Sequence, residues 1–222
     1  MFSVIFEMRV TPGMEGAYAS LRDELDGRMR EVHGFVDNHD HRSLTRDDVR
    51  LSLSTWVDEK ALVRWRTDPL HHDAQGKSRN TVFDEYRFRV GENAVDSAYG
   101  TGQAPNQQRF DETQAGDAPS VTLIATMRPP TWRGTSNAAD CAEFLGLNPY
   151  APGMVSWDLF EDLAAPDSLL LLVAWKAEQA AQAFEDLLSV PEDGRLRRVR
   201  VVRDYGRFDR REAPQYFPER TD

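Results

Sequence analysis

The clearest candidates for chemistry in this sequence are two adjacent histidines, His71 and His72, within the stretch TDPLHHDAQGKSR. A neutral imidazole can accept a proton near pH 7, and it can also bind a metal ion or a haem iron. Neighbouring residues on a helix point about 100° apart, so the two rings cannot bind one metal from a shared helical face. We therefore expect one ring to face solvent and the other to line the space between helix and sheet. The alternatives are that one of them is a polar group or general base in a pocket, or the ligand of a haem or metal.

Two further histidines, His39 and His41, alternate along an expected strand and so share one of its faces. Together with His71 or His72 they could form a three-histidine metal site. The surrounding stretch DNHDHRS is strongly polar, however, which favours a solvated strand face. The sequence therefore predicts no metal site.

Two tryptophans, Trp56 and Trp65, lie on either side of the start of an expected helix. Packing in the core is their ordinary role, but two flat rings could also form the walls of a pocket for an aromatic ligand. Arg87 and Arg89 share one face of an expected strand. They could anchor a carboxylate or pair with acidic residues across the sheet.

Motifs for common cofactors and covalent catalysis are missing from the sequence. The stretch GTGQAP lies in a polar segment with no strand ahead of it, so it is not a phosphate-binding loop. The single cysteine, Cys141, has no nucleophile motif around it and excludes an intramolecular disulfide or a multi-cysteine zinc site. We therefore predict no organic cofactor.

The hydrophobic pattern predicts two similar series of elements that would position these residues. The first series comprises a strand at 2–11, a helix at 14–32, strands at 35–44 and 49–57, a helix at 58–66 that resumes at 69–78 after an Asp-Pro break, and a strand at 80–90. The second comprises a strand at 120–128, a helix near 136–146, strands at 154–163 and 168–175, a helix at 177–189, and a strand at 197–206.

The two series have matching residues at a constant separation, which indicates a tandem duplication. Four pairs are each 119 positions apart: Met8 and Met127, Gly34 and Gly153, Trp56 and Trp175, Tyr86 and Tyr205. We divide the chain into a first repeat at 1–92, a polar linker at 93–117, a second, diverged repeat at 118–211 and a C-terminal tail at 212–222. All five histidines fall in the first repeat, so we expect the chemistry there.

The order βαββαβ in each repeat is that of the ferredoxin-like unit, with both helices on one face of an antiparallel sheet. A sheet of this size leaves its other face uncovered, and two such sheets packed face to face would bury it. We therefore predict an α+β fold in which two ferredoxin-like repeats form an intramolecular dimeric α+β barrel. The fused chain would be a monomeric pseudo-dimer, or it would associate further as a homodimer.

The first repeat resembles the antibiotic-biosynthesis monooxygenase family of dimeric α+β barrels. The resemblance rests on LSLSTWVDEKALVRW, HHDAQGKSR and VFDEYRFRV, and it covers about residues 2–90. It implies a small, cofactor-independent oxygenase that acts on a hydrophobic or aromatic metabolite. Because the superfamily also includes haem-degrading enzymes, a haem protein is the alternative that the resemblance implies.

Residue by residue, the resemblance is incomplete. The polyketide-oxidising members have a tryptophan at the end of the third strand, which Trp56 matches. Their asparagine four residues earlier is Ser52 here, and their tyrosine six residues later is Leu62.

The haem-degrading members have a tryptophan on the second helix, which Trp65 matches. Their asparagine on the first strand is Met8 here, and their proximal histidine, ten residues after the tryptophan, is Gln75.

Composition and charge restrict the partners. A net charge of −10 argues against nucleic acid and against an anionic membrane surface, since both require a cationic face. The N-terminus MFSVIFEMRV lacks the pattern of a signal peptide, and the longest apolar run, SLLLLVAW, is too short for a membrane helix. We expect a cytoplasmic protein that binds a small hydrophobic or aromatic molecule.

Three hypotheses about function follow. In the leading one, the chain is a cofactor-independent monooxygenase in which Trp56 and Trp65 shape a cavity and His71 or His72 is the base. In the second, His71 or His72 is the axial ligand of a haem beside Trp65. In the third, the duplicated barrel is a non-catalytic ligand-binding or assembly protein.

Overall fold

The computed structural model of the chain describes residues 1–99, 115–128 and 137–208. The first repeat contains β1 (Phe2–Val10), α1 (Glu15–Arg30), β2 (Phe35–Ser43), β3 (Val49–Trp56), α2 (Glu59–Arg66), α3 (Pro69–Thr81) and β4 (Phe83–Asp96). The second contains β5 (Ser120–Met127), α4 (Ala138–Phe144), β6 (Met154–Asp162), β7 (Ser168–Trp175), α5 (Glu178–Glu185) and β8 (Arg195–Gly206).

Local sequence explains where the helices of the first repeat begin. Asp58 caps α2 by accepting a hydrogen bond from the backbone N–H of Ala61. Asp68 caps α3 in the same way through Leu70, and Pro69 occupies the first helical position, where its missing N–H costs nothing. The expected break at Asp68-Pro69 therefore separates α2 from a helix of its own, α3, which ends three residues beyond the predicted range of 69–78.

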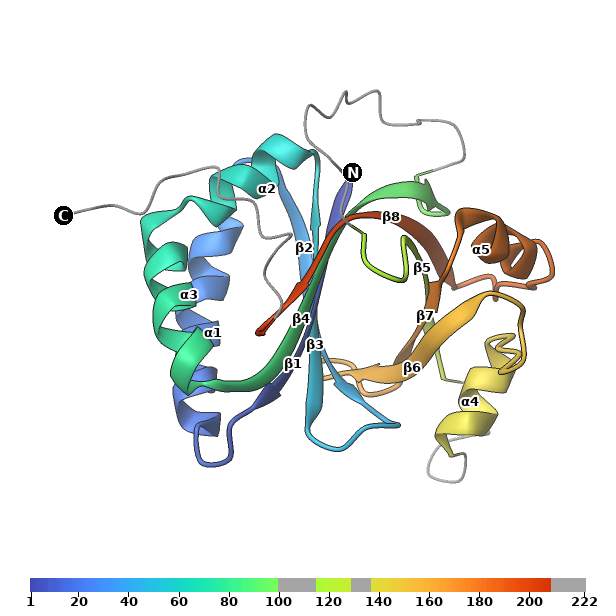
Figure 1. The fold of residues 1–222 in the computed structure, drawn as a ribbon, viewed down its shortest axis with the longest axis horizontal. Helices are drawn as coiled ribbons and strands as arrows, with labels where there is room; N and C mark the ends of the chain where they lie inside the picture. The colour runs from blue at the N-terminus through green and yellow to red at the C-terminus, as the bar shows by residue number, and fades with distance from the viewer. Residues whose placement is uncertain (100–114, 129–136, 209–222) are drawn as a thin grey trace.

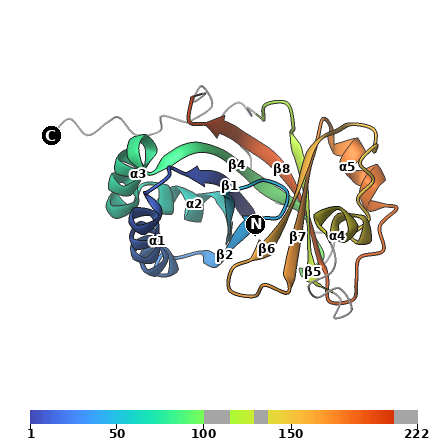
Figure 2. The same cartoon turned by 90° about the horizontal axis from the view of Figure 1, so that it is seen from below.

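The strands form one closed barrel in the order β1-β3-β2-β6-β7-β5-β8-β4. Each repeat supplies four consecutive strands in ferredoxin-like order, and the β2–β6 and β4–β8 pairs join the two sheets. Figure 1 shows α1, α2 and α3 on one side of the barrel and α4 and α5 on the other, an arrangement that Figure 2 shows from below. The predicted α+β fold of two ferredoxin-like repeats fused into an intramolecular barrel is confirmed.

The alternation of side chains divides the core into layers. Residues of both sheets that point into the barrel form one apolar cluster, which includes Ile5, Leu53, Leu123 and Val199. The opposite faces pack beneath the helices as separate clusters, with Trp56 in the first repeat and Trp175 in the second.

Two of the four repeated pairs occupy equivalent places. Gly34 and Gly153 both have positive φ, at 94° and 83°, directly before β2 and β6. Each accepts a hydrogen bond through its carbonyl oxygen, from Val57 N–H in the first repeat and from Lys176 N–H in the second, at 2.9 Å in both. Trp56 and Trp175 end β3 and β7.

The other two pairs, Met8 with Met127 and Tyr86 with Tyr205, do not occupy equivalent places. The prediction that one separation of 119 residues relates the two repeats throughout is therefore wrong. Trp56 pairs with Phe2, whereas Trp175 pairs with Ser120, so the first strands are related by a separation one residue shorter. Met8 is consequently buried and Met127 is 48% exposed.

Tyr86 lies near the start of β4 and Tyr205 near the end of β8, so their match is a coincidence of sequence. The physical reason is that residues 186–194 contain no counterpart of α3 and so shift the last strand. His71 and His72 therefore have no equivalent in the second repeat.

β4 continues to Asp96, beyond the expected end of the strand at residue 90, because its second half pairs with β8 across the joint between the repeats. Most of the expected linker and the whole tail at 212–222 lie outside the described residues. None of the helices in the described ranges combines the length and apolar character needed to cross a membrane.

Candidate functional site

Three of the predicted site residues form a stack of aromatic rings between the first sheet and its helices. Trp56, at the end of β3, is fully buried and lies 6.3 Å from the ring of Trp65 on α2, with 22° between the ring planes. His71, in the first turn of α3, stacks on the other side of Trp65, with 4.1 Å between ring centroids and 9° between planes. The structure therefore brings together Trp56, Trp65 and His71.

Both ring nitrogens of His71 have neighbours. Nδ1 lies 3.0 Å from the carbonyl oxygen of Trp65, so it donates a proton to that oxygen. Nε2 lies 3.3 Å from the amide nitrogen of Gln75 and is left to accept from it. Burial lowers the pKa of His71 to about 4, against the raising effect of the Trp65 carbonyl. The ring is therefore neutral at pH 7.

The remaining histidines lie elsewhere. His72 is exposed to solvent on α3. His39 and His41 share a face of β2 as expected, but that face is the inner face of the barrel, where His39 Nδ1 lies 3.1 Å from Asp162 Oδ2. Among the residues that the structure describes, no three His, Cys, Asp or Glu side chains are arranged to hold a metal ion.

A polar strip lies on the helix-covered face of the first sheet, beside Trp56. Ser54 is the register partner of Asn38, and Ser52 that of Asp40, so all four side chains share this face. The indole nitrogen of Trp56 donates to Ser54 Oγ at 3.0 Å. A sheet face covered by helices is ordinarily apolar, so this strip marks the surface as a candidate site.

Asn38 and Asp40 are site candidates that the sequence interpretation missed. Ser52, which occupies the family's asparagine position, donates its hydroxyl to Asn38 Oδ1 at 3.0 Å, so a neighbouring strand supplies an amide at that place. Burial raises the pKa of the Asp40 carboxyl, and a hydrogen bond from Ser52 and the charge of Arg22 oppose the shift. A signal was available in the sequence, because every residue of β2 from Asp37 to Ser43 is polar, so that the strand has polar side chains on both faces.

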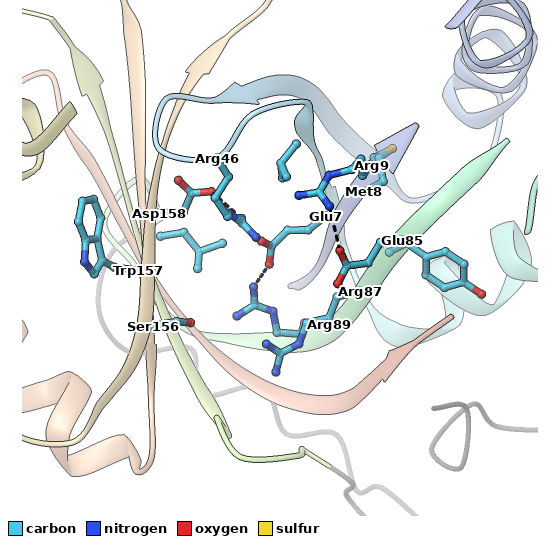
Figure 3. Close-up of a pocket in the computed structure, with 13 residues that line it drawn as sticks. Glu7, Met8, Arg9, Arg46, Glu85, Arg87, Arg89, Ser156, Trp157 and Asp158 are labelled. Carbon is cyan, nitrogen blue, oxygen red and sulfur yellow. Dashed lines mark hydrogen bonds and ion pairs between the residues drawn. The ribbon is translucent and has the colours of Figure 1, made fainter. Parts of the chain in front are cut away.

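A separate cavity of about 320 Å³ lies at one mouth of the barrel (Figure 3). Strands β1 and β4, the β2–β3 turn and the second repeat all contribute to it. It is lined by Glu7, Met8, Arg9, Arg46, Val49, Glu85, Tyr86, Arg87, Arg89, Ser156, Trp157, Asp158 and Leu172.

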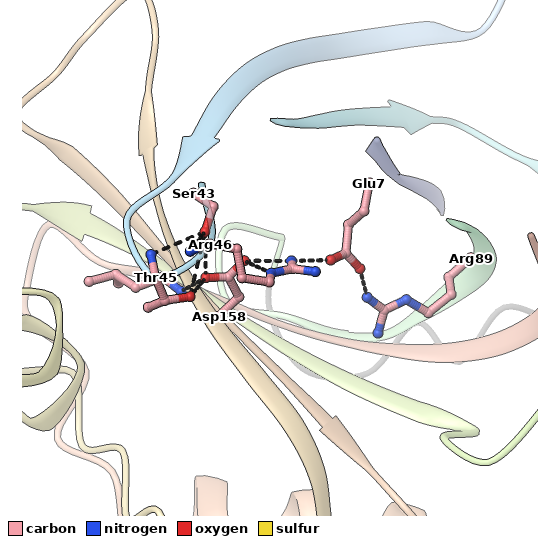
Figure 4. A network of polar contacts seen from close by, with 7 residues as sticks. Glu7, Ser43, Thr45, Arg46, Arg89 and Asp158 are labelled. Atoms are coloured by element: carbon pink, nitrogen blue, oxygen red, sulfur yellow. Dashed lines mark hydrogen bonds and ion pairs between the residues drawn. The ribbon is translucent and has the colours of Figure 1, made fainter. Parts of the chain in front are cut away.

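A network of ion pairs crosses this cavity from one repeat to the other (Figure 4). Arg46 donates to Glu7 and, through Nε at 2.8 Å, to Asp158 on β6. Arg89 donates through Nη2 to the other oxygen of Glu7. Asp158 also accepts from Ser43 Oγ at 2.9 Å. The network therefore ties β1 and β4 of the first sheet to β6 of the second.

The charges in the network are buried to different degrees. Burial alone would raise the pKa of Glu7, but Arg89 and Arg46 outweigh it and hold that pKa below its usual range. The side chain of Arg89 is 2% exposed, and its Nε and Nη1 have no hydrogen-bond partner among the described residues. An unpaired buried donor costs about 1–3 kcal/mol, and more when it is charged.

The expectation for Arg87 and Arg89 is thus answered in part. Both point into the barrel and pair across the sheet, Arg87 with Asp204 at 2.9 Å and Arg89 with Glu7. Glu7 was not singled out from the sequence, although a lone acidic residue inside the apolar strand VIFEMRV is a signal of such a buried pair.

Comparison with known proteins agrees with this architecture. The family model described as antibiotic biosynthesis monooxygenase matches residues 1–77. The chain is 35% identical over 221 residues to a protein of Pyricularia oryzae named jasmonate monooxygenase ABM, covering 98% of this chain and 99% of that one.

Two solved structures show the range of structural similarity. An aldoxime dehydratase, 10% identical, matches 90% of this chain and 80% of its own with a TM-score of 0.55, which shows a shared fold. SnoaB, described as a cofactor-independent oxygenase from Streptomyces nogalater, is 14% identical and matches 47% of this chain and 97% of its own with a TM-score of 0.37. From its similarity to the Pyricularia protein over nearly the whole length, the chain belongs to the antibiotic biosynthesis monooxygenase family.

Proposed function

We propose that this protein is an oxygen-dependent monooxygenase that acts on a small hydrophobic metabolite without an organic cofactor. The observation that carries the proposal is the 35% identity to the jasmonate monooxygenase, which extends through both repeats. Jasmonate, a small carboxylic acid with a cyclopentanone ring, is therefore the first substrate to test.

The chemistry needs no external reductant if the substrate supplies the electrons. A base removes a proton from a carbon next to a carbonyl group, or from a phenol, and leaves an electron-rich anion. The anion reduces O₂ and a C–O bond forms, which gives a hydroperoxide once it is protonated. Loss of water converts a CH₂ group into C=O, so CH₂ and O₂ give C=O and H₂O with all atoms and electrons balanced.

The polar strip of the first repeat supports a specific division of roles. Asp40, whose pKa is raised by burial, is suited to accept the proton at neutral pH. In this proposal the amide nitrogen of Asn38 donates to the oxygen of the anion, and the indole of Trp56 is a flat apolar wall. The earlier assignment of the base to His71 or His72 stays a prediction, and His71 supports Trp65 through the ring stack.

Oxygen uptake with jasmonate, followed by mass spectrometry of the product, tests this proposal. Without added reductant, we expect a product that has gained one oxygen atom and lost two hydrogens, with the oxygen derived from ¹⁸O₂. A product that gains one oxygen without losing hydrogen, and only when a reductant is present, would show that electrons come from outside the substrate. No oxygen uptake would contradict the proposed activity on this substrate.

Single variants locate the base. We expect Asp40→Asn to lower kcat by about 10²–10⁴-fold, which is the usual contribution of a general base. His33→Gln, which alters an exposed histidine outside the strip, is the matched control for the histidine variants and should leave kcat unchanged. If His71→Gln or His72→Gln abolishes turnover while Asp40→Asn does not, the base is a histidine.

The haem alternative receives no support from the contacts of His71. Its Nδ1 donates to the Trp65 carbonyl and its Nε2 meets the Gln75 amide, so no nitrogen is free for an iron ion. His72 is exposed, away from the ring stack. Titration with haem tests the alternative directly: a saturable Soret band that disappears in the His71/His72 double variant would establish it.

A further inference from the structure

The cavity at the barrel mouth has an unusual balance of charge for this protein. Its lining contains four guanidinium groups, those of Arg9, Arg46, Arg87 and Arg89, and three carboxylates, those of Glu7, Glu85 and Asp158. Asp204, which is not among the lining residues, pairs with Arg87 and balances the fourth guanidinium group. Arginine is thus concentrated at this cavity, whereas the whole chain has a net charge of −10.

Guanidinium N–H groups remain available around the cavity. Nε and Nη1 of Arg89 are buried without a hydrogen-bond partner among the described residues. Arg46 uses Nε and Nη2 for its ion pairs, and Arg87 uses the same two nitrogens for Asp204, so Nη1 of each lies outside these pairs. Figure 3 shows Arg46, from the β2–β3 turn, and Arg89, on β4, both joined to Glu7, with Arg87 next to Arg89 on the same strand.

We propose that this cavity is a binding site for a small organic acid, whose carboxylate pairs with Arg89 and is flanked by Arg46 and Arg87. Planar guanidinium groups bind carboxylates through two parallel hydrogen bonds, which suits neighbouring donors of this kind. The inference concerns this cavity alone, and it holds whether or not oxygenation takes place on the polar strip.

The rest of the lining defines the body of the ligand. Val49 and Leu172, which belong to the apolar cluster inside the barrel, provide apolar surface beside the arginines, so the acid carries a hydrophobic group. A volume of about 320 Å³ lies at the lower end of the range for small-molecule sites, about 300–1,000 Å³, which limits the ligand to a small metabolite. The side chains of Arg46 and Arg87 are 43% and 39% exposed, so a ligand can reach the mouth from solvent.

Isothermal titration calorimetry of the unaltered protein tests the charge requirement. The probes are hexanoate, benzoate, 2-naphthoate and jasmonate, each with its methyl ester. We expect at least one acid to saturate a single site and to bind at least tenfold more tightly than its ester. Equal binding of acid and ester, or no saturable binding of any acid at millimolar concentration, would overturn the proposal and leave the arginines as a structural network only.

Two substitutions with opposite expected effects locate the site. Arg89→Gln should weaken binding of the acid at least tenfold. Glu7→Gln should strengthen it severalfold, because it removes the carboxylate that competes for Arg89 and Arg46. A gain in affinity cannot arise from unfolding, so this variant keeps the test informative if Arg89→Gln folds poorly.

Arg30→Gln on α1 is the matched control, because it removes the same charge from a surface pair with Asp26 outside the cavity. We expect it to leave the affinity for the acid unchanged. If Glu7→Gln leaves the affinity unchanged, or if Arg30→Gln changes it as much as Arg89→Gln does, the carboxylate does not bind at Arg89.

Discussion

His71 and His72 are neighbours in the sequence but have entirely different surroundings. The first ring stacks at 4.1 Å on Trp65 and hydrogen-bonds the backbone at that residue, whereas the second projects into solvent. Helix geometry predicts that the two rings diverge, and the Asp68 cap fixes which of them turns inward. A difference in stability between variants of the two residues should follow from this.

We expect His71→Gln to lower the free energy of unfolding by about 1–3 kcal/mol, because it loses a ring stack and a hydrogen bond to a backbone carbonyl. His72→Gln should change it by less than about 0.5 kcal/mol, as is usual for surface substitutions. Urea unfolding of the two variants measures both values. Equal effects of the two substitutions would contradict the packed position of His71.

At the scale of elements, the entry into the second strand of each repeat depends on a glycine. Gly34 and Gly153 have positive φ, and the carbonyl of each accepts a hydrogen bond from the residue that directly follows β3 or β7. A Cβ atom at Gly34 would lie 2.6 Å from the Cβ of Ala61 on α2, and one at Gly153 would lie 2.8 Å from the Cβ of Ala180 on α5. The same glycine thus lets the helix approach the sheet in both repeats.

Alanine at either glycine should destabilise the protein by about 1–3 kcal/mol, through the cost of left-handed backbone and the contact with the helix. Gly27→Ala is the control within α1, where an added Cβ meets no atom within 4 Å. It should stabilise the protein by up to about 1 kcal/mol, because alanine favours the helix. Thermal unfolding distinguishes the two directions, and a stabilising Gly34→Ala would refute the argument.

At the scale of the whole molecule, closure of the barrel buries ionisable groups that open sheets would expose. His41 is 5% exposed inside the barrel, and its Nδ1 has no hydrogen-bond partner among the described residues. Burial lowers its pKa from 6.5 to about 4, although Asp162 acts in the opposite direction. Folding therefore holds this ring in its neutral form.

This burial makes stability depend on pH. Between pH 6.5 and about 4 the unfolded chain takes up a proton at His41 that the folded chain refuses, so the stability present above pH 6.5 is lost as the pH falls through this range. A shift of this size corresponds to about 3 kcal/mol. His71, with its similarly lowered pKa, contributes in the same direction.

Urea unfolding at pH 7 and at pH 4.5 measures this dependence. His41→Asn should reduce the loss of stability between the two pH values. The same measurement on His33→Gln is the control, since His33 is exposed to solvent. If His41→Asn and His33→Gln show the same pH dependence as the unaltered protein, the buried histidine does not carry the effect.

The sequence by itself determined the series of elements, the fold class and the family. Those features follow from local patterns: the alternation of apolar residues in the strands, the Asp-Pro start of α3, and a tryptophan at the end of β3. It also identified Trp56, Trp65 and His71, which the structure brings into one stack. It wrongly matched Tyr86 with Tyr205. The two local motifs are similar, but they do not reveal that the second repeat lacks a counterpart of α3, which shifts its last strand.

Only the tertiary structure decided which polar side chains meet. Asn38 reaches Ser52 from the neighbouring strand, and Glu7 meets both Arg46 and Arg89 across the barrel mouth. These contacts depend on strand register and on how the two sheets close, and residues far apart in the chain fix both. The cavity and the ion-pair network that crosses it therefore exist only once the two repeats have joined.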